Sequence, residues 1–179
     1  MGGCSSAQVA PEGVPQQPRK QNNWCLCCAQ RKQGSSTKIM NKGDIEATKP
    51  TPEEAKSWEN DFIGLLRHKY GLNVFQEFLR TQYGDENLNF WMAVEEYKKI
   101  SDKNSRNDMA RMIYEDYVST LSPTEISLDA KIRAAVDKEM SDPDENTFQL
   151  AQQHIFELMH RDCLPRFLKS KAYKQLTKR

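Results

Sequence analysis

From Thr51 to the end of the chain, apolar residues recur every three or four positions, and this period restricts the fold more than any other feature. The apolar positions of the first helix, in the stretch "TPEEAKSWENDFIGLL", are Ala55, Trp58, Phe62, Leu65 and Leu66. Thr51 is suited to cap that helix, Pro52 fits its first position, and Glu54 completes a capping box. The sequence therefore predicts that an ordered domain begins at residue 51.

The same period continues to the C-terminus. It predicts further helices around Leu72–Leu79 (after Gly71), Phe90–Tyr97, Met109–Tyr117, Ile132–Val136 (capped by Asp129), Phe148–Met159 and Phe167–Leu176. No stretch alternates apolar and polar residues as a half-buried strand would. We expect residues 51–179 to form a compact all-α domain of seven or more helices, with no internal repeat.

Residues 1–50 have a different composition. They are rich in Gln, Asn, Ser, Gly, Pro and Lys, with too few apolar groups to offset the entropy of ordering, so a disordered tail is expected. Residues 1–43 carry six bases and one acid, a net charge of +5, whereas the other 136 residues carry 20 bases and 24 acids, a net charge of −4. A basic tail suits an anionic membrane surface, while near-neutrality of the whole chain argues against a nucleic-acid binder.

No apolar run approaches the ~20 residues that span a bilayer, and no signal peptide is visible, so we expect a protein of the cytosolic side with reduced cysteines.

One polar cluster in the domain raises a question of function. In "QYGDENLNFWMAVEEYKKI" the residues Asp85, Glu86 and Asn87 directly precede a run that must be buried. Gly84 or Asp85 marks a helix boundary, and acidic groups there favour the positive end of the helix dipole. That interpretation accounts for the two acids but less well for Asn87, because asparagine forms helices poorly beyond the cap. Local rules favour a helix start over a binding surface.

Three blocks in order, "FLRTQYGDENLNFWMAVEEYKK", "IYEDYVSTLSPTEISLD" and "IFELMHRDCLPRFLKS", resemble the regulator of G-protein signalling (RGS) domain. The resemblance covers about residues 57–176 and is greatest to the RZ subfamily, which carries an N-terminal cysteine string. It implies a bundle of about nine helices and a GTP-bound Gα partner, with the Gi, Go and Gz classes favoured.

The resemblance also implies a binding surface, because in that family the loop before the aromatic pair helps to hold the switch regions of Gα. Carried over residue by residue, the Gα-binding positions are Gln82, Tyr83, Gly84, Glu86, Asn87, Ser127, Leu158, Asp162, Cys163 and Arg166. Asn87 and Ser127 would brace the switch segments, with Ser127 near the Gα glutamine. Asp162 would accept hydrogen bonds from a switch segment, and Arg166 would orient Asp162 from behind.

The implied activity is GTPase activation without catalytic residues, cofactor or metal in this chain. Gα already carries its catalytic arginine and a water-orienting glutamine, so a partner that binds the transition-state arrangement of the switches lowers the barrier. The chain is expected to act as a monomer.

The tail contains two candidate lipidation motifs. "MGGCSS" fits the myristoylation pattern with Gly2 as acceptor, and Cys4 beside it is a candidate for palmitoylation. "NNWCLCC" adds Cys25, Cys27 and Cys28 next to an interfacial tryptophan, a shortened form of a cysteine string. Redox or zinc chemistry of this C-x-x-C is less well supported, since no second Cys/His pair lies nearby. Together with the charge, these motifs predict the cytosolic face of membranes, the plasma membrane first, with a part in the cytoplasm.

Two other functions compete with activation. The first is a membrane-anchored adaptor that binds a partner without accelerating hydrolysis. It draws on Gly84, Ser127 and Cys163, which stand where many relatives carry serine, asparagine and serine. The second is an enzyme in its own right. The sequence offers little support for it, since we find no nucleophile–base pair, phosphate-binding glycine loop or metal-ligand cluster.

Overall fold

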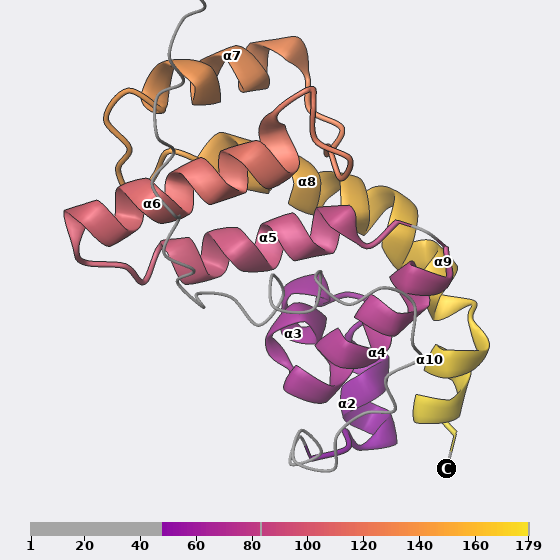
Figure 1. Cartoon of the computed structure of the whole chain (residues 1–179). Coiled ribbons are helices and arrows are strands. Elements are labelled where there is room, and N and C mark those ends of the chain that lie inside the picture. Colours follow the sequence, from indigo (N-terminus) through magenta and orange to yellow (C-terminus); the bar gives the residue numbers. More distant parts are fainter. Residues whose placement is uncertain (1–47, 83, 179) are drawn as a thin grey trace, which may run out of the picture. The chain divides into compact units, whose positions relative to one another are not determined.

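The computed structural model describes residues 48–82 and 84–178, which all belong to one compact unit. Every regular element in these ranges is helical, so the expected all-α class is confirmed. No helix in the described ranges is long and apolar enough to cross a bilayer. The elements (Figure 1) are α2 (Pro52–Ser57), α3 (Phe62–Arg67), α4 (Lys69–Thr81), α5 (Glu86–Tyr97), α6 (Lys103–Ile113), η2 (Tyr114–Val118), α7 (Ala130–Glu139), α8 (Gln149–Leu158), η3 (Met159–Cys163), α9 (Leu164–Leu168) and α10 (Lys171–Leu176).

The predicted start of the first helix is confirmed in detail. The Thr51 side chain accepts a hydrogen bond from the Glu54 amide at 3.1 Å, and the Glu54 carboxylate accepts one from the Thr51 amide at 3.4 Å. The disorder expected for residues 1–50 falls almost wholly outside the described residues. The domain boundary at residue 51 stays a prediction.

The expected single helix through Leu66 is wrong, because the chain turns between α2 and α3. Asp61 caps α3, its carboxylate accepting a hydrogen bond from the Gly64 amide at 2.9 Å. The helix expected after Gly71 also begins earlier, at Lys69, where the His68 ring nitrogen Nδ1 accepts from the Gly71 amide at 3.1 Å. These bonds satisfy amide groups that a helix start leaves unpaired.

Gly71 is required by packing. A Cβ atom built there would lie 2.8 Å from the Trp58 ring and 2.9 Å from a Leu65 methyl group. Since carbon atoms in contact stay about 3.5–4.0 Å apart, only glycine lets the start of α4 approach α2 and α3 this closely.

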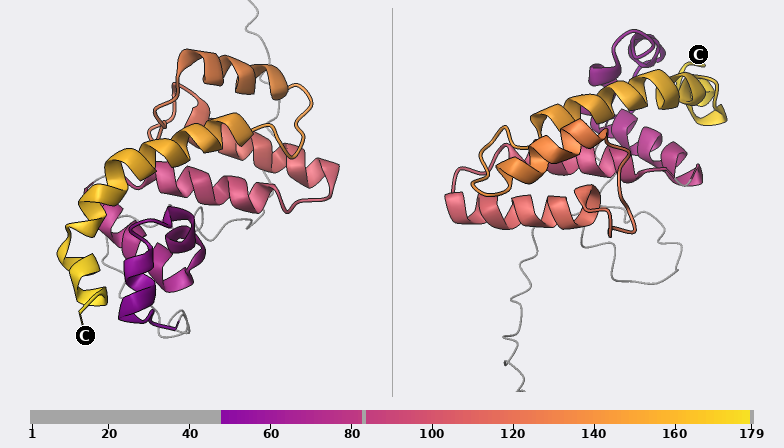
Figure 2. Two further views of the ribbon diagram at one scale, coloured as in Figure 1. Left: turned by 180° about the vertical axis from the view of Figure 1, so that it is seen from behind. Right: turned by 90° about the horizontal axis from the view of Figure 1, so that it is seen from above.

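The helices form two groups joined by one continuous helical run from Gln149 to Leu168. Helices α5, α6, α7 and α8 make one group, and α2, α3, α4, α9 and α10 the other (Figures 1 and 2). Aromatic rings fill both cores. Phe75 lies 5.1 Å from Phe167 in one group, and Phe148 lies 5.2 Å from Tyr97 in the other (ring centroids). The run α8–η3–α9 therefore fixes how the two groups meet.

A buried polar side chain holds α8 on α5. The side-chain amide of Gln152 donates to the Trp91 carbonyl at 3.2 Å and to the Glu95 carboxylate at 2.8 Å, and its oxygen accepts from the Lys98 ammonium at 2.5 Å. Gln152 is only 5% exposed, so each unpaired polar atom there would destabilise the fold by about 1–3 kcal/mol. These bonds set the register of α8, whose end carries part of the predicted binding surface.

Candidate functional site

The loop between α4 and α5 carries the first group of predicted site residues. The predicted helix boundary is confirmed, with Gln82 after the last residue of α4 and Glu86 in the first turn of α5. Asp85 occupies the N-cap position, yet its carboxylate makes no capping bond. It accepts instead from the Asn89 amide at 3.0 Å and from the Arg80 guanidinium at 3.4 Å. Because Asn89 also accepts from Gln76 of α4 at 2.9 Å, the loop is braced against α4.

Asn87 differs from its polar neighbours. Its side-chain oxygen Oδ1 is buried and has no hydrogen-bond partner within the described part of the chain. Buried polar atoms in native proteins nearly always have a partner, so such an atom needs an explanation. The explanation that the predicted function offers is a donor from another molecule.

The second group lies in the connection between η2 and α7. Side chains of Ser122 and Thr124 both donate to the Asp116 carbonyl, the latter at 2.6 Å, and the Ile126 amide donates to the Tyr117 carbonyl at 2.9 Å. These bonds tie the connection back onto η2. They leave Ser127 exposed at the edge of a pocket.

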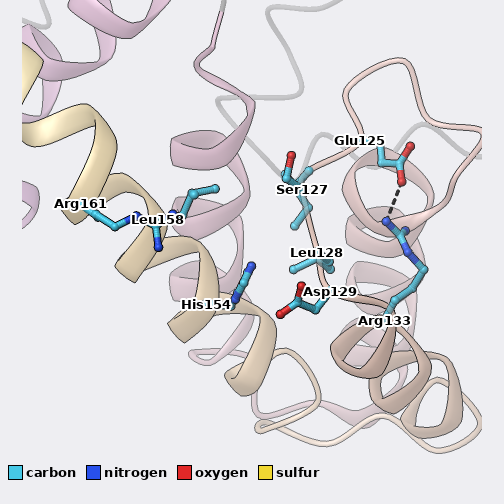
Figure 3. A pocket seen from close by; sticks show the side chains of 9 residues that line it. Glu125, Ser127, Leu128, Asp129, Arg133, His154, Leu158 and Arg161 are labelled. Carbon is cyan, nitrogen blue, oxygen red and sulfur yellow. Dashed lines mark hydrogen bonds and ion pairs between the residues drawn. The ribbon is translucent and has the colours of Figure 1, made fainter.

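That pocket has a volume of about 740 Å³ and lies between this connection and α8 (Figure 3). Its lining residues are Glu125, Ile126, Ser127, Leu128, Asp129, Arg133, His154, Leu158 and Arg161. Two predicted site residues, Ser127 and Leu158, therefore face the same space from different elements. On the Ser127 side, the Arg133 guanidinium pairs with the Glu125 carboxylate at 2.6 Å.

The third group lies on η3 and α9, where Arg166 contacts Asp162 through the backbone of that residue. The Asp162 carboxylate is paired with Arg161, at 3.0 and 3.2 Å, and not with Arg166. Arg166 donates to the backbone carbonyl of Asp162 at 3.0 Å and approaches the Cys163 sulfur at 3.8 Å. Arg166 therefore fixes the backbone of η3, whereas Arg161 orients the carboxylate.

Charge and burial set the ionisation of this segment. The side-chain hydrogen bonds from Arg161 hold the pKa of the Asp162 carboxyl below its ordinary value, so it is anionic at neutral pH. Burial raises the pKa of the Cys163 thiol, and the negative charges of Asp162 and Glu86 add to that effect. Cys163 is therefore a neutral, mostly buried thiol.

The α8–η3–α9 run joins the three groups. Glu86, from the first group, is close enough to Cys163 for its charge to act on the thiol. Ser127, from the second, lies across the pocket from Leu158. Segments far apart in sequence thus meet around one helical run. That run departs from α-helical geometry in η3, and π-helical turns are frequent at functional sites.

Sequence reasoning missed several pocket residues. His154, Leu158 and Arg161 have i, i+4 and i+7 spacing, which places them on one helical face, and Asp129 and Arg133 are likewise four apart. Because Leu158 was a predicted site residue, the spacing of His154 and Arg161 from it could have predicted that they lie on the same face.

Other predicted residues lie outside the described ranges. They are Tyr83 and the lipidation candidates Gly2, Cys4, Cys25, Cys27 and Cys28. In the described ranges, no three Cys, His, Asp or Glu side chains lie close enough together to hold a metal ion.

Residues 61–176 match the protein family described as "Regulator of G protein signaling domain". The chain belongs to the RGS domain family. The match spans α3 to α10 and so includes all three segments of the candidate site.

Among curated relatives of this RGS chain, Regulator of G-protein signaling 19 of Rattus norvegicus is 48% identical over 129 residues, which is 72% of this chain and 60% of the relative. Regulator of G-protein signaling 20 of Bos taurus is 48% identical over 131 residues, 73% of this chain and 35% of the relative. Regulator of G-protein signaling rgs-1 of Caenorhabditis elegans is 40% identical over 152 residues, 85% and 74% of the two chains.

The likeness to the RZ subfamily is thereby confirmed. The matches to the first two relatives span between about a third and three fifths of their lengths.

Proposed function

We propose that this RGS chain is a GTPase-activating protein for heterotrimeric G-protein α subunits, with the Gi, Go and Gz classes favoured. Family membership supports the activity, since the matched region contains every described residue of the candidate site. The likeness to the RZ subfamily supports the choice of Gα class. The chain ends G-protein signalling by returning Gα to its GDP-bound state.

The observation that carries the proposal is the buried Asn87 oxygen, which has no hydrogen-bond partner among the described residues. A buried amide acceptor without a donor destabilises the free domain by about 1–3 kcal/mol. When the Asn87 side chain turns toward the surface, a partner that supplies an N–H or O–H group to its oxygen removes that penalty on binding. Functional sites commonly retain such local violations of the packing rules. Asn87 therefore binds a Gα switch segment at the cost of some stability in the free chain.

The remaining site residues supply complementary contacts. Asp162, held in one orientation and kept anionic by Arg161, accepts hydrogen bonds from backbone amides or basic groups of a switch segment. Leu158 and Ser127 line opposite sides of a space that a short side chain of a switch segment enters. Charged and apolar contacts on three separate segments fix a loop more firmly than contacts on one.

The mechanism is positional. Gα supplies the arginine that stabilises charge and the glutamine that orients water, and both lie on mobile segments. The RGS surface binds those segments best in the arrangement they adopt in the transition state, so binding energy lowers the barrier to hydrolysis. No described side chain of this chain needs to gain or lose a proton.

Membrane attachment forms part of the proposal. Gly2 and Cys4, with Cys25, Cys27 and Cys28, are the proposed acyl acceptors, and the net charge of +5 on residues 1–43 adds attraction to anionic lipid. One myristoyl chain gives only marginal binding, so a second acyl group or this charge is needed. Mass spectrometry of the N-terminal peptide from cells tests this, and an unmodified Gly2 contradicts myristoylation.

The activity is tested by single-turnover GTP hydrolysis on purified Gα subunits of the i, o, z and q classes, with and without the full chain. We expect acceleration for the first three. Binding to them without any acceleration would support the adaptor and overturn the proposal.

Two variants make the assay specific to the site. Asp162→Asn removes a charge from the candidate site, and Asp142→Asn removes one from an exposed residue that pairs with Lys103 at 2.9 Å. Both carboxylates are substantially exposed, so the two folds should be equally unaffected. Only Asp162→Asn should slow the accelerated hydrolysis. Equal rates for both would remove Asp162 from the site.

A further inference from the structure

The charge of the folded domain is divided unevenly along the chain. Residues 44–163 carry 14 bases and 24 acids, a net charge of −10. Residues 164–178, which form α9 and α10, carry five bases and no acid. A domain that is acidic elsewhere therefore ends in a strongly basic segment.

Four of these bases are exposed on or next to α10, and we name them the α10 lysine face: Lys169, Lys171, Lys174 and Lys178. On α10, Lys171 and Lys174 lie one turn apart. The buried residues Tyr173 and Leu176 occupy the opposite side of the helix, since each residue advances about 100° around the axis. The ammonium groups of the face consequently extend from a segment whose other side is packed.

Contacts with α2 fix the orientation of that face. The Tyr173 hydroxyl lies 3.2 Å from both the Ala55 carbonyl and the Glu59 carboxylate of the neighbouring segment. Figures 1 and 2 show α10 beside α2 accordingly. Lys171 and Lys174 are thus on the side of α10 that faces away from this contact.

The lysines of the α10 lysine face resemble Lys131 and Lys138 in making no ion pair within the described ranges, whereas three other lysines are paired. On or next to α5 and α6, Lys98, Lys99 and Lys103 pair with acidic side chains at 3.3, 2.7 and 2.9 Å. Within residues 48–82 and 84–178, none of the four lysines of the face makes an ion pair. The Glu59 carboxylate lies beside α10, at 3.2 Å from the Tyr173 hydroxyl, and one such acid leaves the four lysines as a net positive surface that attracts anions.

We propose that the α10 lysine face docks on a membrane surface that contains anionic lipids. Charge complementarity supports a polyanionic partner, and the position of the face supports a membrane. It lies beside α2, where the basic N-terminal tail joins the domain. In the described chain the large apolar side chains that are exposed are Leu121 and Leu150, and neither is on α9 or α10. The face therefore lies on the headgroups without inserting into the bilayer.

This docking holds whether or not the chain activates Gα, because it uses none of the candidate site residues. It also decides which side of the folded domain is turned toward the bilayer. Arg166, which fixes the backbone of η3, is on α9 next to the face, so docking would hold the candidate site close to the membrane.

The test uses the full chain without acyl groups and vesicles of phosphatidylcholine with or without phosphatidylserine. One variant replaces Lys169, Lys171, Lys174 and Lys178 by glutamine. The matched control makes the same change at Lys99, Lys103, Lys131 and Lys138, four exposed lysines on or next to α5, α6 and α7. Each lysine near an anionic surface contributes about fivefold in binding. We expect the face variant to bind phosphatidylserine vesicles at least about tenfold more weakly, and the control to change less than about threefold.

If both variants lose vesicle binding equally, the loss follows from net charge alone, and the proposal is overturned. So would a face variant that keeps its vesicle binding but loses binding to a DNA duplex, since the face would then serve another polyanion. Lysine acetylation of the unaltered chain gives a second test that requires no folding control. Anionic vesicles should protect Lys171 and Lys174 and leave Lys131 and Lys138 reactive, whereas equal reactivity would contradict docking.

Discussion

Replacing Asn87 by alanine should make the free domain more stable and, on the proposed function, make its complex with Gα weaker. The substitution removes a buried oxygen that has no partner among the described residues, which relieves about 1–3 kcal/mol. Alanine also favours the helix, by at most about 0.7 kcal/mol, although Asn87 is only the second residue of α5. Lost packing of a half-buried side chain offsets part of this gain. We expect the free energy of unfolding to rise by about 1 kcal/mol.

In the complex the sign is reversed. On the proposed function, Asn87→Ala removes the acceptor that a Gα donor would satisfy, so we expect the transition-state complex to weaken by about 1–3 kcal/mol, or about 5- to 150-fold. Urea denaturation gives the first quantity, and the concentration of chain needed for half-maximal acceleration of GTP hydrolysis gives the second. A rise of 1 kcal/mol in the free energy of unfolding corresponds to a rise of about 2–4 °C in Tm for a chain of this size.

The fold contains a matched control for this prediction. Asn107 on α6 also has a buried side-chain oxygen without a partner in the described residues, and it lies on none of the three site segments. Asn107→Ala should stabilise the domain similarly and leave acceleration unchanged. If Asn87→Ala instead destabilises the domain by more than about 1 kcal/mol, its oxygen takes part in an internal network and the reasoning fails.

Further predictions concern ionisation. Arg161→Gln should raise the pKa of Asp162 toward its ordinary value, measured by carbon-13 NMR titration, because Arg161 is the main cause of the lowered pKa; no change would contradict that pairing. Cys163 should react slowly with iodoacetamide at pH 8 in the folded chain and quickly in urea, followed by peptide mass spectrometry, since burial raises its pKa. Burial and then Glu59 raise the pKa of Tyr173 to about 12, so an ultraviolet titration should show a late rise in absorbance that Tyr173→Phe reduces. The stability that this neutral hydroxyl contributes is present below pH 10 and should be lost as the pH rises toward 12.

Helix content could be predicted from sequence because it depends on local signals. The capping box at Thr51 is made by residues three apart, and the structure reproduces it. Breaks within an apolar period were harder to detect, since a turn of three or four residues preserves the spacing. Asp61 and Ser170 each start a new helix inside such a run, so one expected helix became α2 and α3 and another became α9 and α10. A short polar residue with cap chemistry was the signal at both positions.

The candidate site was predicted less completely. Family resemblance supplied its positions, whereas the partners of each side chain depend on packing. The resemblance implied that Arg166 orients Asp162; Arg166 contacts the backbone carbonyl of Asp162, whereas the carboxylate pairs with its neighbour Arg161 in the π-helical segment η3. The unpaired oxygen of Asn87 likewise follows from burial by the surrounding fold. Sequence alone contains no local signal for it.

The central claim is that this chain binds the reacting conformation of Gα more tightly than its resting conformation. It is tested most directly by measuring the affinity of the full chain for one Gαi protein in two states, GDP-bound and loaded with a transition-state analogue. We expect the analogue complex to bind at least about tenfold more tightly. Equal affinities would contradict the account.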